Sequence, residues 1–155
     1  MKRRVRIPWT PSGDVAAGVR LHLPPLIKDY FAAGRVAAQP QTSAVKLHKF
    51  RLATKRLRYT LELFQPLYGP GLSQRLAQLR TIQDLLGDGH DATVTSARLA
   101  GRVRRDPALG PVLAALELRA RKKHAEFRSF WTHRFDGAGN ELRWTNYLRR
   151  PTKSA

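Results

Sequence analysis

A histidine and a row of cations lie close together between residues 47 and 64. The members of this basic row are His48, Arg51, Lys55, Arg56 and Arg58, with the hydroxyl group of Tyr59 beside them. At about 100° per residue, most of the row falls on one face of a helix. A guanidinium group can donate two charge-assisted hydrogen bonds to a phosphate, and the histidine adds a donor that titrates near neutral pH. The row therefore favours binding of consecutive phosphate groups, and the alternative is an ordinary solvated basic face.

The chain as a whole is strongly basic. It has 155 residues, with 29 Lys and Arg against 11 Asp and Glu, and a formal net charge of +18 at pH 7. Between Asp29 and Glu62 there are seven Lys and Arg and no acidic residue, so no neighbour in the sequence neutralises the basic row. Such an excess indicates a polyanionic partner, which is nucleic acid, anionic lipid or a phosphate polymer.

Several kinds of chemistry are excluded by what the sequence lacks. There is no cysteine, which excludes disulfides, thiolate metal sites and cysteine nucleophiles. There is no glycine-rich phosphate loop and no nucleophile elbow, and the few acidic residues form no paired-carboxylate site. No segment approaches about 20 uninterrupted apolar residues, so we expect no membrane span. We therefore expect a cytoplasmic binding protein that is not an enzyme and needs no cofactor.

The elements that must carry the basic row are helices. Proline and glycine clusters separate stretches with helical periodicity, and no alternating apolar pattern predicts a strand. We expect one all-α domain, a bundle of about four to five helices, over residues 13–135. A basic N-terminal arm at 1–12 precedes it, and a basic C-terminal tail at 136–155 follows. In that tail Trp144, Tyr147 and Leu148 are able to dock on the body, while residues 149–155 are expected to fray.

Caps and breakers predict five helices. The first runs from about residue 14 to 34 and is kinked or split at Pro24 and Pro25. The others run from a cap at 42 or 43 to about 68, from 72 to 86, from 91 to 104, and from 111 onward. Gly87 is expected to end the third helix, and Asp91 to cap the fourth after a turn at 88–90.

Two of these helices carry an apolar stripe that predicts their buried face. Opposite the basic row, the second helix has Leu47, Phe50, Leu57, Leu61 and Phe64. The fifth helix has Leu113, Leu116, Ala120, Phe127 and Trp131. The basic row is thereby predicted to face away from the core.

Two further clusters have weaker claims to a function. Within a basic cluster at 119–123, Arg119 and Lys123 share one flank of the fifth helix and could extend the anion site, although solvated side chains are the commoner outcome. The acidic and histidine side chains at 84–91 include types that ligate divalent ions. A helix end, a turn and an N-cap explain that cluster without a metal, so we predict no metal site.

Two motifs follow each other between about Val45 and Val94. The first is His48-x-x-Arg51-x-x-x-Lys55-Arg56-Leu57-Arg58-Tyr59-x-Leu61-Glu62, and the second is Leu79-Arg80-x-Ile82-Gln83-Asp84-x-Leu86-Gly87-x-x-His90-Asp91. In this order they resemble the CHAD family, the conserved-histidine α-helical domain. Members of that family are helical bundles with a strongly basic surface that bind inorganic polyphosphate. Many are fused to, or encoded near, triphosphate-processing enzymes.

The resemblance implies a set of phosphate ligands and a function without catalysis. The implied ligands are His48, Arg51, Lys55, Arg56 and Arg58, with Tyr59 as a neighbouring donor. Association with polyphosphate granules is a further hypothesis. Two alternatives remain: a nucleic-acid-binding helical protein, and an adaptor for a polyphosphate-processing enzyme. The basic face has no Asn or Gln to read bases and only one aromatic side chain to stack on them, which favours polyphosphate over nucleic acid.

The chain departs from the family in size. A usual member has two related helical halves, whereas this chain resembles the second half only and has no first copy of the His-x-x-Arg motif. Apolar residues on another side of the second helix, Val45, Leu52 and Leu63, would then lack a facing partner. A two-fold homodimer would supply one, and polyphosphate would bridge its two basic faces.

Overall fold

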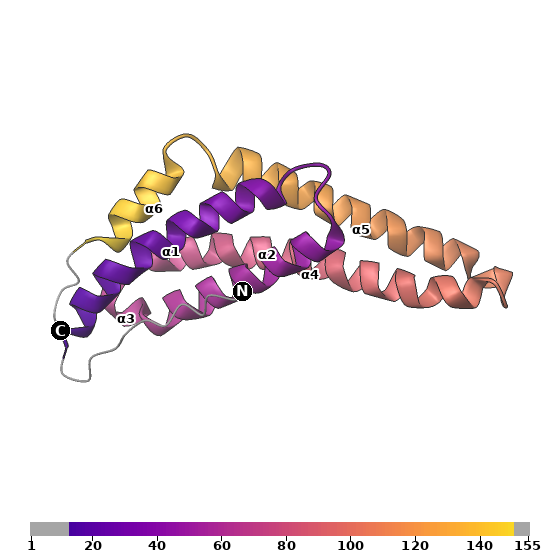
Figure 1. The fold of residues 1–155 in the computed structure, drawn as a ribbon, viewed down its shortest axis with the longest axis horizontal. Helices are drawn as coiled ribbons and strands as arrows, with labels where there is room; N and C mark the ends of the chain where they lie inside the picture. The colour runs from indigo at the N-terminus through magenta and orange to yellow at the C-terminus, as the bar shows by residue number, and fades with distance from the viewer. Residues whose placement is uncertain (1–12, 151–155) are drawn as a thin grey trace.

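All of the regular secondary structure in the residues that the structure describes is helical (Figure 1). The computed structural model describes residues 13–150, so the predicted basic arm at 1–12 and residues 151–155 lie outside it. Its helices are α1 (Val15–Ala37), α2 (Ala44–Leu63), α3 (Gln65–Tyr68), α4 (Gly71–Val103), α5 (Gly110–Phe130) and α6 (Asn140–Leu148), with a 3₁₀ turn at Pro107–Leu109 and a π-helical turn at Trp131–Phe135. The all-α prediction is confirmed. None of the described helices is both long and apolar enough to cross a membrane.

α1 begins where the sequence predicted and continues through two prolines. The carboxylate of Asp14 accepts a hydrogen bond from the backbone N–H of Ala16 at 2.9 Å and so caps the helix. Pro24 and Pro25 lie inside α1, and the helix is not split there. A proline inside a helix removes a backbone donor and is unfavourable by about 3 kcal/mol. Burial of Pro24 and of the adjacent Leu23 in the core helps to offset that penalty.

α4 is a single helix of 33 residues, which contradicts the prediction of two helices separated by a turn. Gly87 does not end a helix and Asp91 does not cap one, because both lie inside α4. A Cβ added at Gly89 would lie 2.6 Å from the ring of His124 on α5, so this glycine lets the two helices approach closely. At Gly87 the nearest side chain is that of Arg51, 3.5 Å from where a Cβ would be. These glycines therefore lie under packed side chains and do not form a turn.

The core is rich in aromatic side chains. Six of them form a continuous set of ring contacts: Tyr30, Phe31, Phe50, Phe127, Trp131 and Phe135. Gly34 of α1 makes room for the indole ring of Trp131, because a Cβ there would lie 2.0 Å from it. The predicted buried face of α2 is confirmed, since its five apolar residues are between 0% and 6% exposed. The opposite face of α2 is thereby left for the basic row.

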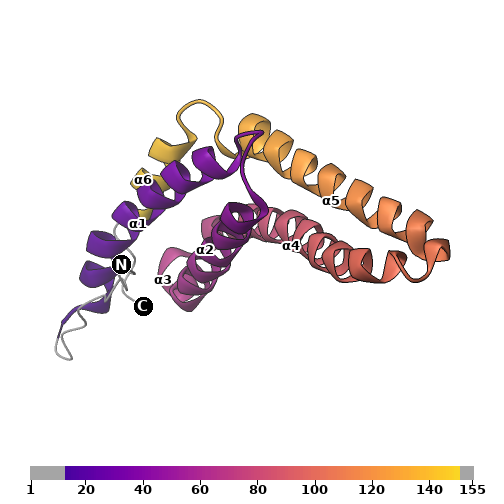
Figure 2. The same ribbon diagram turned by 45° about the vertical axis from the view of Figure 1, so that its right-hand side comes forward.

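α4 and α5 continue together beyond the rest of the molecule. Figures 1 and 2 show the two helices side by side, with the reversal of the chain at their far end. We call residues 93–119 the α4–α5 arm, and none of them is fully buried. The predicted stripe of α5 is therefore buried only in part. Phe127 and Trp131 lie in the core, whereas Leu113 and Leu116 lie on the arm and are half-buried.

The predicted C-terminal tail contains a helix, α6, which packs on α1 (Figure 1). Trp144, Tyr147 and Leu148, the residues expected to dock the tail, are at most 8% exposed. The hydroxyl of Tyr147 donates to the carbonyl oxygen of Tyr68, and the hydroxyl of Tyr68 donates to that of Leu148, each at 2.9 Å. The docking is confirmed, and the packed body extends through Leu148.

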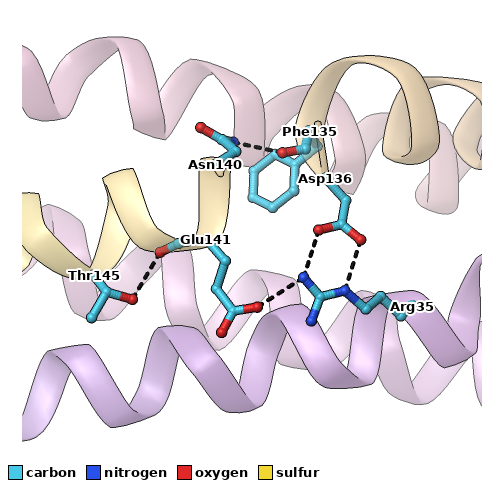
Figure 3. Close-up of polar contacts among 6 residues, drawn as sticks. All are labelled: Arg35, Phe135, Asp136, Asn140, Glu141 and Thr145. Atoms are coloured by element: carbon cyan, nitrogen blue, oxygen red, sulfur yellow. Dashed lines mark hydrogen bonds and ion pairs between the residues drawn. The ribbon is translucent and has the colours of Figure 1, made fainter. Parts of the chain in front are cut away.

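Arg35 of α1 fixes the start of α6 (Figure 3). Its guanidinium group donates to both carboxylate oxygens of Asp136 at 2.8 Å and also pairs with Glu141 at 2.8 Å. The hydrogen bonds to Asp136, and then those to Glu141, raise the pKa of Arg35 above its usual value. The positive charge of Arg35 is therefore neutralised by carboxylates of the same fold.

Candidate anion-binding site

α2 and α4 pack side by side in opposite directions, and most of the basic row lies along the line where they meet. His48 contacts His90, and further along α2 Glu62 faces Arg80. We call this line the seam. Its members are His48, Arg51, Lys55, Arg58 and Tyr59 of α2, and Gln83, Gly87 and His90 of α4.

Two imidazole rings stack at one end of the seam. The ring centroids of His48 and His90 are 4.3 Å apart, and their planes are inclined by 28°. The Nδ1 of His48 is buried without a hydrogen-bond partner among the described residues, and so is the Nε of Arg51. Buried polar atoms in proteins usually have a partner. This end of the seam therefore holds two covered nitrogen atoms without a protein partner in the described part of the chain.

At the other end of the seam, a carboxylate neutralises the cations. The Nε of Arg58 donates to the Oε1 of Gln83 at 2.9 Å, and its Nη1 donates to Glu62. The Nη2 of Arg80 lies 3.7 Å from the same carboxylate. The side chain of Arg58 is only 11% exposed. Arg58 therefore has less capacity to bind an added anion than its place in the basic row suggested.

Between these ends, Lys55 and Tyr59 face solvent. Tyr59 is 49% exposed, and Lys55 is also exposed. The guanidinium carbon of Arg58 lies 4.4 Å from the centroid of the Tyr59 ring, and the Nζ of Lys55 lies 5.6 Å from it. Cations at these distances are attracted by the face of the ring. The ring of Tyr59 thus holds both cations beside it.

The remaining predicted cations lie away from the seam. Arg56 is exposed and lies about 100° around α2 from Lys55. Arg119 and Lys123 are 3.6 and 4.0 Å from the carboxylate of Asp88. Asp88 directly follows Gly87 of the seam, so it lies about 100° around α4 from the seam. The structure thus brings five of the eight predicted residues together and places these three elsewhere.

Burial and positive charge both act on the histidines near the seam. Burial lowers the pKa of His90, and the neighbouring His48 and Arg51 lower it further. Burial also lowers the pKa of His124 on α5, with Arg128 and His90 acting in the same direction. In the free protein both imidazoles are therefore held in the neutral form to lower pH than a histidine in water.

His90, His124 and Gln83 were not among the predicted site residues. With a turn at 88–90, as the sequence predicted, His90 would lie on no helix face. Once α4 is continuous, Gln83, Gly87 and His90 recur at spacings of four and three and so share one face. The signal that could have shown this is the apolar stripe of residues 72–86, which continues in phase with the small residues that follow it. His124 could not be assigned in this way, because only helix packing brings it to α4.

The acidic residues at 84–91 lie along one continuous helix. Within the part of the chain that the structure describes, no group of three or more His, Cys, Asp or Glu side chains could hold a metal ion. Asp88 instead faces the cations of α5.

The helical body and its seam define a small all-α domain that presents part of a basic helix to solvent. The chain belongs to the CHAD family, whose domain model matches residues 9–100. The matched part includes α1, α2, α3 and most of α4, and therefore the whole seam, whereas α5 lies beyond it. No curated protein and no solved structure shows a significant match to the chain.

Proposed function

We propose that the protein binds inorganic polyphosphate along the seam, without catalysis. The CHAD domain is associated with polyphosphate binding in general, and a net charge of +18 suits a polyanion. The main support for the proposal is positive charge in the seam that no carboxylate within residues 13–150 neutralises. None of the ion pairs among the described residues involves Arg51 or Lys55, whereas Arg58 and Arg80 share Glu62. A cytoplasmic location at polyphosphate granules would follow from this function.

The spacing of the free donors suits a chain of bare phosphates. From His48 to Lys55 the axial distance along α2 is about 10 Å at 1.5 Å per residue. An extended phosphate chain over that length meets an imidazole, a guanidinium group and an ammonium group in turn. Arg51 can bind one phosphate through two hydrogen bonds, and Lys55 acts as a point charge.

A nucleic acid is the alternative ligand, and the seam offers little to its bases. The side-chain oxygen of Gln83 already accepts a hydrogen bond from Arg58. The ring of Tyr59 has the cations of Arg58 and Lys55 within 4.4 and 5.6 Å of its centroid, so less of its face is open to stacking. Reading bases needs free amides, and stacking needs open aromatic faces. We therefore expect a nucleic acid to bind through its backbone and more weakly.

Competition between ligands tests the proposal. The protein is first loaded with long labelled polyphosphate. Unlabelled polyphosphate, duplex DNA or single-stranded RNA is then added as the competitor, at matched phosphate concentration in about 150 mM salt. We expect polyphosphate to bind at least roughly tenfold more tightly than either nucleic acid, because bare phosphates carry more charge per length and need no base contacts. Equal or tighter binding of DNA would overturn the proposal.

A pair of matched variants locates the binding site. Arg51→Gln with Lys55→Gln removes two seam cations, and Arg98→Gln with Arg102→Gln removes two exposed cations from the α4–α5 arm. We expect the seam variant to bind more weakly and to reduce the slope of log affinity against log salt by about 1 to 2. The arm variant should change both far less. Equal losses would show that total charge, and not the seam, binds the ligand. Far-UV circular dichroism checks that both variants stay helical.

A second surface of α2 is open beside the seam. Val45 and Leu63 are 63% and 72% exposed, and Leu52 is half-buried; these three form the outer α2 patch. We propose that polyphosphate brings two copies of the chain together on this patch, because a chain that runs past one seam can be held by a second. The ligand would also remove the repulsion between two copies of charge +18. An adaptor role toward a polyphosphate-processing enzyme is the alternative use of the same patch.

A further inference from the structure

Titratable groups from three helices meet at the histidine end of the seam. His48 of α2 and His90 of α4 stack with their centroids 4.3 Å apart. His124 of α5 lies against Gly89, where an added Cβ would be 2.6 Å from its ring. Gly89 precedes His90 directly in α4, so the third imidazole lies close to the stacked pair.

Most of the charge that faces this pair is positive. Arg51 contributes from α2, and its Nε is buried without a hydrogen-bond partner among the described residues. From α4 the carboxylate of Asp91 acts on His90 in the opposite direction. From α5 the neighbouring groups are His124 and, beside it, Arg128. Burial and the neighbouring His48 and Arg51 lower the pKa of His90, so the free protein disfavours a charged His90 ring.

A neutral imidazole pair is a poor ligand for phosphate. A neutral imidazole has one N–H donor and one lone pair, whereas a protonated one has two donors and a positive charge. The oxygens of an ionised phosphate only accept hydrogen bonds, so a lone pair turned toward them repels them. An anion placed beside the rings therefore favours the protonated form. Two charges at the stacking distance would repel each other strongly, which limits the pair to one proton.

We propose that a phosphate group bound at the His48–His90 end of the seam adds one proton to the imidazole pair, so that polyphosphate binding is coupled to proton uptake. This inference rests on the proposed function, since it concerns the same site and ligand. The proton comes from the buffer, stays on the pair while the ligand is bound and returns when the ligand leaves. No bond in polyphosphate is broken. By linkage, affinity rises as pH falls, by up to about tenfold per pH unit where uptake is complete.

Isothermal titration calorimetry counts the protons. The unaltered protein is titrated near neutral pH with long polyphosphate, in buffers that differ in their heat of ionisation. The slope of the measured heat against the buffer's heat gives the number of protons exchanged. We expect uptake of about 0.5 to 1 proton per occupied seam. Long chains keep the terminal phosphates few, which matters because those groups titrate near neutral pH themselves.

Variants assign the proton to the pair. The double change of His48→Gln with His90→Gln removes both imidazoles and keeps polar side chains, and we expect uptake to fall close to zero in this variant. His133→Gln is the control, because His133 is exposed on the π-helical turn; its uptake should equal that of the unaltered protein. A second measurement needs no variant. The chain has five histidines, and on addition of polyphosphate the NMR signals of His48 and His90 should move toward those of protonated rings.

The outcomes separate this inference from the proposed function. Polyphosphate that binds with no proton uptake and no movement of the histidine signals would overturn the inference and leave the proposed function intact. Uptake that persists in the double variant, which has neither imidazole, would also overturn it, because the proton would then be bound elsewhere. If polyphosphate does not bind at all, both fall together.

Discussion

The close packing of α1 on the π-helical turn can be tested with one methyl group. A Cβ at Gly34 would lie 2.0, 2.1 and 2.6 Å from three carbon atoms of the Trp131 indole, whereas non-bonded carbon atoms rest about 3.5–4.0 Å apart. Trp131 is 1% exposed, and its ring is in contact with those of Phe31 and Phe135. The indole therefore has no free space into which it can move, and Gly34→Ala overpacks the core.

The expected loss of stability follows from two opposing effects. Overpacking a core is unfavourable by about 1–3 kcal/mol, occasionally more. Replacing glycine by alanine inside a helix is favourable by up to about 1 kcal/mol. Because the contact must open from 2.0 Å to at least about 3.5 Å, the first effect is at its upper end. We expect Gly34→Ala to lower the free energy of unfolding by about 2 kcal/mol, and hence Tm by about 4–8 °C for a domain of this size.

Gly18 supplies the matched control on the same helix. A Cβ there would have nothing within 4 Å, so Gly18→Ala should raise Tm by about 1–4 °C through helix propensity alone. Thermal unfolding followed by far-UV circular dichroism measures both variants, and near-UV circular dichroism reports the packing of the tryptophans. If Gly34→Ala melts as high as Gly18→Ala, α1 does not approach Trp131 as described.

Three more predictions concern α4 and the surfaces beside it. Gly87→Ala should raise Tm, because its Cβ would be at an ordinary contact distance of 3.5 Å, while Gly89→Ala, at 2.6 Å from His124, should lower it; equal shifts would contradict the packing of α5 on α4. Without ligand, the free energy of unfolding should fall as the pH drops below the ordinary histidine value of 6.5, because the lowered pKa values of His90 and His124 mean that the unfolded chain binds more protons there. Urea unfolding at about pH 7.5 and about pH 5.5 measures this loss of stability. If the double variant His90→Gln with His124→Gln loses as much stability between the two pH values, other groups are responsible. Light scattering should give a monomer mass without polyphosphate and a dimer mass with it, and Leu63→Glu in the outer α2 patch should prevent the dimer; a monomer in both conditions would end the dimer proposal.

Local features of the fold were predictable from the sequence. The buried face of α2 follows from a 3.6-residue periodicity that needs no knowledge of the partner helix. The start of α2 is equally local, since the hydroxyl of Ser43 accepts a hydrogen bond from the backbone N–H of Lys46. The start of α1 at Asp14 has the same cause. Where a feature depends on residues within one turn of each other, sequence and structure agree.

The middle of α4 was not predictable in this way. The segment Gly87-Asp88-Gly89 has the composition of a turn, and in isolation its glycines weaken a helix by up to about 1 kcal/mol each. Packing against α2 and α5 decides the matter, because Arg51 and His124 occupy the space that a larger side chain would need. Both side chains are distant from α4 in the sequence.

One part of the candidate site could be predicted from the sequence of α2, and the other part depends on tertiary packing. Periodicity placed His48, Arg51 and Lys55 on one face of α2, but it could not show which cations are neutralised. Arg58 is neutralised by Glu62 of the same helix, whereas its hydrogen bond to Gln83 and the approach of Arg80 to Glu62 depend on tertiary packing of α4 against α2. The stacking of His48 on His90 likewise exists only once α2 lies against α4.

The free energy of local unfolding should be lower in the α4–α5 arm than in the rest of the molecule. No residue at 93–119 is fully buried, so the amide hydrogens of the arm should exchange with solvent faster toward its tip than those beside the core. The tip also exposes Arg102, Arg104 and Arg105 around Gly101, which makes it an early target for trypsin. From His90 to Arg102 the distance along α4 is about 18 Å, so a nick there leaves the seam assembled. The same tip could carry an inserted reporter domain, because it lies at the end of the molecule that no other helix covers (Figure 2).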